Sequence, residues 1–210
     1  MQIRKMFKFN NMHVVRNCSS ERCKFSLHAH TYEIEIIFSG NSVDNGKMIM
    51  DFGLMKGTIK DLIMSFHNSL TVWDKDKELI KEMSNITDRI VITPFSPSAE
   101  QFSLYFLGAL RGVLRSTEFN NGEGDIVVHS VKVHETRSGY AESFYSDYEL
   151  IDYKLSDIKF SNKIKDGWKI PNMYGKMIEY IKNNKNIFGH DEKPFKNPVI
   201  EMQVIENEEA

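Results

Sequence analysis

The alternation of hydrophobic and polar residues predicts strands near the start of the chain. Residues 3–16 alternate loosely, and residues 28–39 alternate closely enough to place aromatic and aliphatic side chains on one face of a half-buried strand. The polar residues 17–27 between them indicate a loop. A further strand is expected over residues 47–52, so the chain begins with strands joined by polar connections.

The period then changes to that of amphipathic helices. Apolar residues recur at helical spacing over residues 55–66 and again over residues 102–114. Ser98 and Gln101 have the spacing of a capping box, which predicts the start of the second helix. Two shorter elements are expected between the long helices: a helix over residues 77–83 and an extended run over residues 89–93.

Two more strands are expected after the second helix. Residues 125–135 alternate, and the aromatic-rich residues 140–150 form their hairpin partner. The alternation assigns five residues to one face of the first of these strands: Val127, His129, Val131, Val133 and Glu135. Strands at both ends with helices between them predict an α+β fold, in which an antiparallel sheet carries two helices on one face.

The character of the chain shifts near residue 151. The tail beyond it is rich in Lys and Asn, contains no Arg and includes Trp168. We therefore expect one domain over residues 1–150 and a C-terminal extension of unknown role over residues 151–210. The extension could cover a sheet edge, enlarge an oligomer interface or form a loose appendage.

Composition excludes several classes of function. A net charge of -2 provides no bulk attraction for nucleic acid or an anionic membrane. No apolar run reaches the length of a membrane span, and the first residues lack the apolar core of a secretory signal. We therefore expect a cytoplasmic protein, in which Cys18 and Cys23 are free thiols rather than a disulfide.

Three histidines are the most informative side chains. His28 and His30 are two residues apart in a predicted strand, so their imidazoles point to the same face. His13, from the preceding strand, would complete a set of three nitrogens. Three protein ligands with one open position are typical of catalytic zinc. A lone His-x-His pair is more often an ordinary surface or core feature, and other motifs must support the metal.

Further motifs provide that support. Five fragments occur in a specific order: His13 with His28-Ala29-His30, Gly46 to Phe52, Ser65 to Leu70, Pro97 to Glu100, and Val133 to Thr136. Over about residues 6–150 the chain resembles the family of 6-pyruvoyl-tetrahydropterin synthase and 6-carboxy-5,6,7,8-tetrahydropterin synthase (QueD). Each fragment is weak alone, and the five together are specific.

The resemblance implies a tunnelling fold (T-fold), a homo-oligomer (hexamer or tetramer) whose sheets close into a barrel, with active sites at subunit interfaces. It implies zinc as cofactor and 7,8-dihydroneopterin triphosphate as substrate. In the carboxy-synthase branch the product enters queuosine (7-deazaguanine) synthesis. Two alternatives stay open, namely a pyruvoyl-type product and a non-catalytic homologue that binds pterin or zinc.

The resemblance also implies roles for individual residues. His13, His28 and His30 would hold the zinc. Cys23 and His67 would share proton transfer, with Cys18 as the reserve thiol. Three residues would bind the pterin or line its site: Glu135 as the anchor, with Ser98 and Glu100 assisting. The triphosphate would also need cations, and four are candidates by their proximity in the sequence alone: Arg16, Arg22, Lys24 and Arg137.

Three departures from the family pattern bear on activity. Phe66 stands where the family has an Asp that orients the catalytic His, and no motif marks a substitute, although Asp74 is near in sequence. Cys23 is five residues before His28 rather than four. Ala29 replaces the Gly between the paired histidines. His67 could also serve as an ordinary helix-capping residue, and Glu135 as a solvated strand end.

Overall fold

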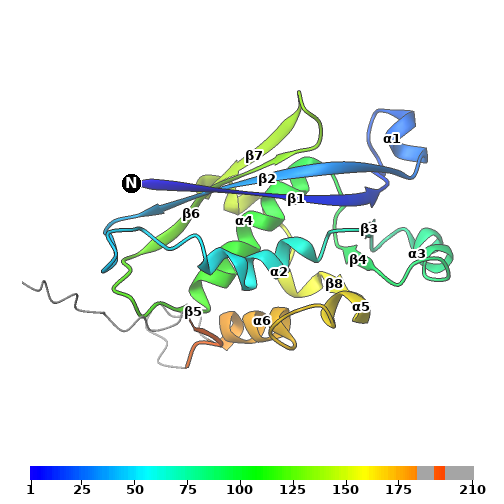
Figure 1. The fold of residues 1–210 in the computed structure, drawn as a ribbon. Coiled ribbons are helices and arrows are strands. Elements are labelled where there is room, and N and C mark those ends of the chain that lie inside the picture. Colours follow the sequence, from blue (N-terminus) through cyan, green and yellow to red (C-terminus); the bar gives the residue numbers. More distant parts are fainter. Residues whose placement is uncertain (184–191, 197–210) are drawn as a thin grey trace, which may run out of the picture.

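The computed structural model describes residues 1–183 and 192–196 and shows one large sheet with helices on one face (Figure 1). The sheet has seven strands in the order β7-β6-β2-β1-β3-β4-β8. The strands are β1 (Gln2–His13), β2 (His28–Gly40), β3 (Ser69–Trp73), β4 (Ile90–Thr93), β6 (Ile126–His134), β7 (Tyr140–Phe144) and β8 (Lys159–Phe160). A separate pair joins β5 (Thr117–Glu118) to β9 (Phe195–Lys196).

The helices vary in length. The α-helices are α1 (Glu21–Phe25), α2 (Thr58–Met64), α3 (Lys77–Met83), α4 (Ala99–Arg115), α5 (Asn162–Lys165) and α6 (Met173–Asn183). The described residues also form three 3₁₀ turns: η1 (Leu54–Lys56), η2 (Tyr145–Leu150) and η3 (Leu155–Asp157). The fold is α+β, as the hydrophobic pattern predicted.

The four strands β7, β6, β2 and β1 form an antiparallel sheet, as predicted. The other strands make the whole sheet mixed, because β3 runs parallel to both β1 and β4. The sequence pattern did not reveal β3. Its residues 69–72 are all buried, so the strand lacks the alternation by which a half-exposed strand is recognised.

Helix α4 is the centre of the core. It packs against β6 and β7, and α6 packs against its other side (Figure 1). The helix begins where predicted, since the Ser98 hydroxyl accepts a hydrogen bond from the Gln101 N–H at 3.3 Å. Its Phe102 and Phe106 are fully buried. Each such side chain contributes about 1.5–3 kcal/mol to the free energy of unfolding.

The strand predicted over residues 47–52 is wrong. The segment is a loop in which Lys47 has a positive φ of 64° and Met48 pairs with Asp44 through its N–H and its carbonyl. Ile49 and Met50 are both buried, which successive residues of a half-exposed strand cannot be. The segment from 17 to 27, expected to be a loop, contains the short helix α1.

The single apolar face predicted for residues 125–135 is interrupted. The pairing of β6 with β2 shifts at Ile37 and Phe38, which leaves His129 as an extra residue in β6. Val131 and Val133 are buried as expected, but Val127 is 43% exposed. The bulge therefore preserves the inward face only toward the end of the strand, where Glu135 follows.

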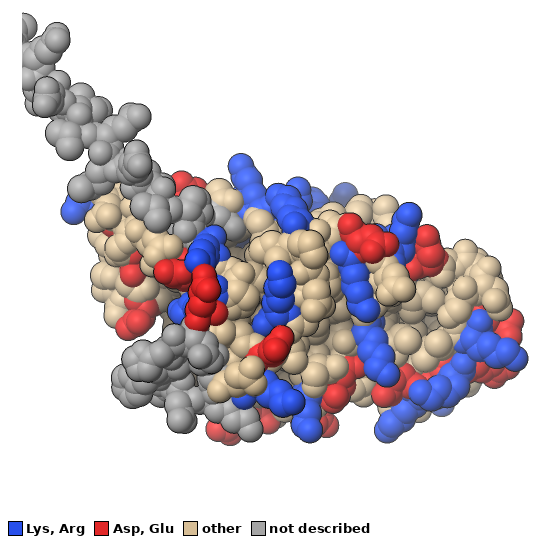
Figure 2. Space-filling view, turned by 90° about the horizontal axis from the view of Figure 1, so that it is seen from below, with Lys and Arg blue, Asp and Glu red and all other residues tan. Residues whose placement is uncertain are grey.

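Residues 151–183 share the core with the first 150 residues. Strand β8 pairs with β4, and Phe160, Trp168 and Met177 are buried in the same hydrophobic cluster as α4. Figure 2 shows the molecule from below, where Lys and Arg are interspersed with Asp and Glu. Among the described residues, no helix combines the length and the apolar character needed to cross a membrane.

Candidate metal and substrate site

The pairing of β1 with β2 brings the three histidines together. His13 is the direct cross-strand partner of His28, and His30 follows two residues later on the same face. One potential ligand atom from each of the three lies within 4.8 Å of the other two. The triad predicted from the sequence is therefore assembled by strand register alone.

Backbone carbonyls orient two of these rings. Nδ1 of His13 lies 2.6 Å from the carbonyl oxygen of Pro97, and Nδ1 of His28 lies 2.9 Å from that of Ser26. A carbonyl only accepts, so each Nδ1 carries the proton and each Nε2 keeps its lone pair for a metal. Neither carbonyl has a signature in the side-chain sequence, and sequence reasoning missed both.

Burial favours the neutral form of two of the three histidines, and the neutral form is the one that binds a metal. His13 is fully buried, and loss of hydration lowers its pKa to about 4. Partial burial also lowers the pKa of His30. Imidazole nitrogens are common zinc ligands, so these three residues fit a catalytic zinc site with three protein ligands and a fourth, open position.

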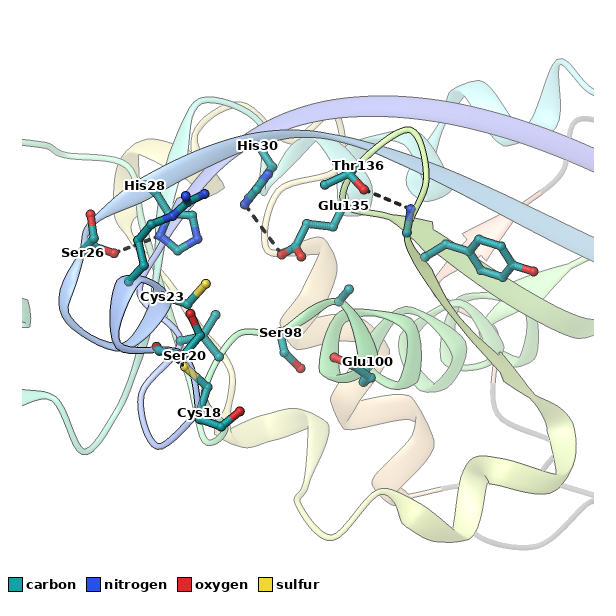
Figure 3. A pocket seen from close by; sticks show the side chains of 16 residues that line it. Cys18, Ser20, Cys23, Ser26, His28, His30, Ser98, Glu100, Glu135 and Thr136 are labelled. Atoms are coloured by element: carbon teal, nitrogen blue, oxygen red, sulfur yellow. Dashed lines mark hydrogen bonds and ion pairs between the residues drawn. The ribbon is translucent and has the colours of Figure 1, made fainter.

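Glu135 lies beside the triad. Its Oε1 is 3.7 Å from Nε2 of His13. The same oxygen is 3.8 Å from Nε2 of His30, a contact marked in Figure 3. The hydroxyl of Tyr32 donates a hydrogen bond to the same oxygen at 3.0 Å. Burial and the charge of Glu135 raise the pKa of Tyr32, so the hydroxyl stays protonated and remains a donor. Tyr32 was assigned only to the core from the sequence.

A cavity of about 540 Å³ opens next to these residues, a volume typical of small-molecule sites. Figure 3 shows His30 and Glu135 on one wall, and Ser98 and Glu100 from the start of α4 on the opposite wall. The structure thus brings most of the predicted residues to one place: His28, His30, Cys18, Cys23, Ser98, Glu100 and Glu135 line the cavity.

Both cysteines are free thiols, as expected. Cys23 lies on α1, and in Figure 3 it stands between the histidines and Cys18. The thiol of Cys18 donates to the carbonyl oxygen of Ser20 at 3.1 Å. This geometry favours Cys23 over Cys18 as the thiol that faces a bound molecule.

The four cations proposed for a triphosphate differ in position. Arg22 lines the cavity. Arg16 instead braces the loop, because its guanidinium donates to Asp76 at 2.6 Å and to the carbonyl oxygen of Lys24 at 2.7 Å. The Lys24 ammonium lies 5.3 Å from the centre of a neighbouring aromatic ring, and Arg137 is outside the lining of the cavity.

His67 is not in this cavity within one chain. It lines a separate recess of about 410 Å³ with Asp61, Arg89 and Trp168. Phe66 before it is fully buried, with ring contacts to Phe102 and to other aromatic residues of the core. Phe66 is therefore a core residue, and a carboxylate at this position would lose its hydration.

The comparisons with known proteins agree with this geometry. The family model of 6-pyruvoyl tetrahydropterin synthase matches residues 2–145. The chain belongs to this family. The 6-carboxy-5,6,7,8-tetrahydropterin synthase of Helicobacter pylori strain J99 is 43% identical over 141 residues, which cover 67% of this chain and 70% of that protein. The protein of the same description from Rickettsia typhi is 30% identical over 56% of this chain and 81% of that protein.

Among solved structures, an uncharacterized protein of Wolinella succinogenes superposes with a TM-score of 0.55. The match covers 69% of this chain and 98% of that one, at 16% sequence identity. Such a likeness concerns the fold alone, which is the T-fold of the tetrahydropterin synthase family. The family match ends at residue 145, so α5 and α6 lie outside it.

Proposed function

We propose that this member of the family is a zinc-dependent 6-carboxy-5,6,7,8-tetrahydropterin synthase that acts on 7,8-dihydroneopterin triphosphate in queuosine synthesis. One observation carries the proposal. Three clustered imidazoles, two of them oriented by backbone carbonyls, lie beside a cavity that also holds a thiol and a carboxylate. The 43% identical relative from Helicobacter pylori bears this name and supports the choice within the family.

The chain's own groups divide the work of binding. Glu135 accepts hydrogen bonds from the amino group and ring N–H of a pterin, while Tyr32 donates a hydrogen bond to its Oε1. Ser98 and Glu100 face the pterin from the start of α4, and Arg22 is the cation placed to meet phosphate. Zinc, when bound, supplies a Lewis acid that acidifies protons on the substrate side chain.

Proton transfer on that side chain needs a base on one side and a donor to its oxygen atoms on the other. Cys23 supplies the base, from the wall next to His28. We propose that His67 supplies the donor from a neighbouring subunit, because its own chain keeps it in a separate recess. The active enzyme is then a homo-oligomer, in which Ile164, Gly167 and Trp168 of the extension line the recess.

The test is product analysis of zinc-loaded protein incubated with 7,8-dihydroneopterin triphosphate, by mass spectrometry. We expect 6-carboxytetrahydropterin together with acetaldehyde. A 6-pyruvoyl product would instead show that the protein has the pyruvoyl-type activity.

A second candidate is a pterin-binding protein without turnover, which the buried Phe66 favours because it removes the orienting carboxylate. Unchanged substrate, in protein shown to contain zinc and to bind pterin, would establish that reading and overturn the proposed enzyme.

A further inference from the structure

The imidazole of His67 has an unusual partner. The backbone N–H of Asn10 donates a hydrogen bond to Nδ1 of His67 at 3.2 Å. A backbone N–H only donates, so Nδ1 must be an acceptor. In the neutral ring the proton is then on Nε2, which is the opposite tautomer from the one that a carboxylate bound at Nδ1 would select.

The turn that carries His67 is held by a buried amide. Asn11 is 1% exposed, and its side-chain Nδ2 donates to the carbonyl oxygens of Phe66 at 3.0 Å and Ser69 at 2.9 Å. These two carbonyls bracket His67 and Asn68. The Asn68 N–H donates to the carbonyl oxygen of Asn10 at 2.8 Å, and Asn68 adopts a positive φ of 49°.

Other groups fix the same turn from the opposite side. The guanidinium of Arg89 donates to the carbonyl oxygen of His67 at 3.0 Å and to that of Met64 at 3.3 Å. Asp61 is the carboxylate among the described residues that line the recess, and its Oδ2 accepts the backbone N–H of Lys169 at 2.9 Å. It is therefore engaged elsewhere.

We propose that these contacts from Asn10, Asn11 and Arg89 replace the missing orienting carboxylate and make His67 a neutral hydrogen-bond donor through Nε2–H. Asn11 is its positioning residue. The catalytic consequence rests on the proposed function. His67 donates a hydrogen bond to a substrate oxygen, and proton abstraction is left to Cys23. To act as a base at Nε2, the ring would have to exchange tautomer and lose the bond from Asn10.

The tautomer is tested without turnover. Full-length, zinc-loaded protein labelled with ¹⁵N at histidine is examined at pH 8 by long-range ¹H–¹⁵N correlation, and the spectrum of His67→Gln assigns the ring. We expect a protonated Nε2 and an unprotonated Nδ1. A protonated Nδ1, or rapid averaging of the two tautomers, would overturn the proposal even if the enzyme is active.

The donor role is tested by two substitutions of His67. The side-chain amide of Gln can donate from a position near Nε2 but cannot act as a base. We expect His67→Gln to retain at least tenfold more kcat than His67→Ala. Equal loss in both variants would contradict the donor role. If wild-type protein holds zinc but gives no product, the proposed function fails, while the spectrum still decides the tautomer.

The positioning role is tested by Asn11→Asp, which removes the amide donor at nearly constant volume. We expect kcat to fall about tenfold or more with KM within twofold and zinc content unchanged, together with averaged ring signals of His67. Asn121→Asp is the matched control, since Asn121 is also buried and its Nδ2 donates to Asp44, remote from both sites.

The control should lower the melting temperature without changing kcat. An equal loss of kcat in both variants would show that Asn11 matters only for stability. If Asn11→Asp does not fold, the wild-type spectrum and the His67 pair still test the proposal.

Discussion

The histidine triad and the recess of His67 belong to the same active-site proposal but are built differently. The triad lies on two neighbouring strands, and its members are joined by one register between β1 and β2. The recess draws on α2, on Arg89 before β4 and on Trp168 beyond the family match. Local strand geometry is sufficient for the first site, whereas the second requires segments that meet only in the folded chain.

The two sites also differ in how their imidazoles are oriented. His13 and His28 face carbonyl oxygens at Nδ1, so their Nε2 atoms are acceptors that suit a metal. His67 faces an N–H at Nδ1, so its Nε2 is a donor. The same side chain thus takes opposite roles, because the backbone group placed next to it differs.

Removal of residues 151–210 should have the largest effect, because these residues contribute to both the core and the recess of His67. It deletes buried apolar side chains such as Phe160, Trp168 and Met177, each contributing about 1.5–3 kcal/mol. The summed contribution of these side chains approaches the whole stability of a typical domain, about 5–15 kcal/mol. The deletion also opens the recess of His67. We expect no cooperative transition in urea unfolding of the truncated chain. Unchanged melting and assembly would instead make the extension a loose appendage.

His28→Ala should affect the histidine triad alone, because it removes one metal ligand and no part of the recess of His67. His28 is half-buried, so the fold tolerates the change better than at the fully buried His13. We expect zinc affinity to fall about 100- to 1,000-fold, the share of one ligand in a zinc site, with the His67 tautomer unchanged. Metal analysis after dialysis measures the effect. His134→Ala is the control, and equal zinc in both variants would refute the metal assignment.

Tyr32→Phe is expected to have the smallest effect and to distinguish pterin binding from metal binding. It removes only the hydroxyl that donates to Glu135, a hydrogen bond to a charged group worth about 1.5–3 kcal/mol. We expect pterin affinity, measured by calorimetry, to fall about tenfold while zinc content stays at the wild-type level. A loss of zinc would show that Tyr32 acts on the triad rather than on Glu135, the carboxylate proposed to bind the pterin.

The sequence by itself determined the features that depend on short-range pattern. Alternation identified β1 and β2, and with them the face shared by His13, His28 and His30. Helical spacing with Ser98 identified α4. These succeed because side-chain direction repeats every two residues in a strand and about every 3.6 in a helix.

Tertiary structure alone decided the rest. The fully buried β3 and the bulge at His129 have no periodic signal, since burial there comes from neighbours distant in sequence. The same is true of the groups that choose a tautomer, which are the carbonyl of Pro97 for His13 and the N–H of Asn10 for His67. Every residue has a backbone carbonyl and almost every residue an N–H, so only the folded chain determines which one meets an imidazole.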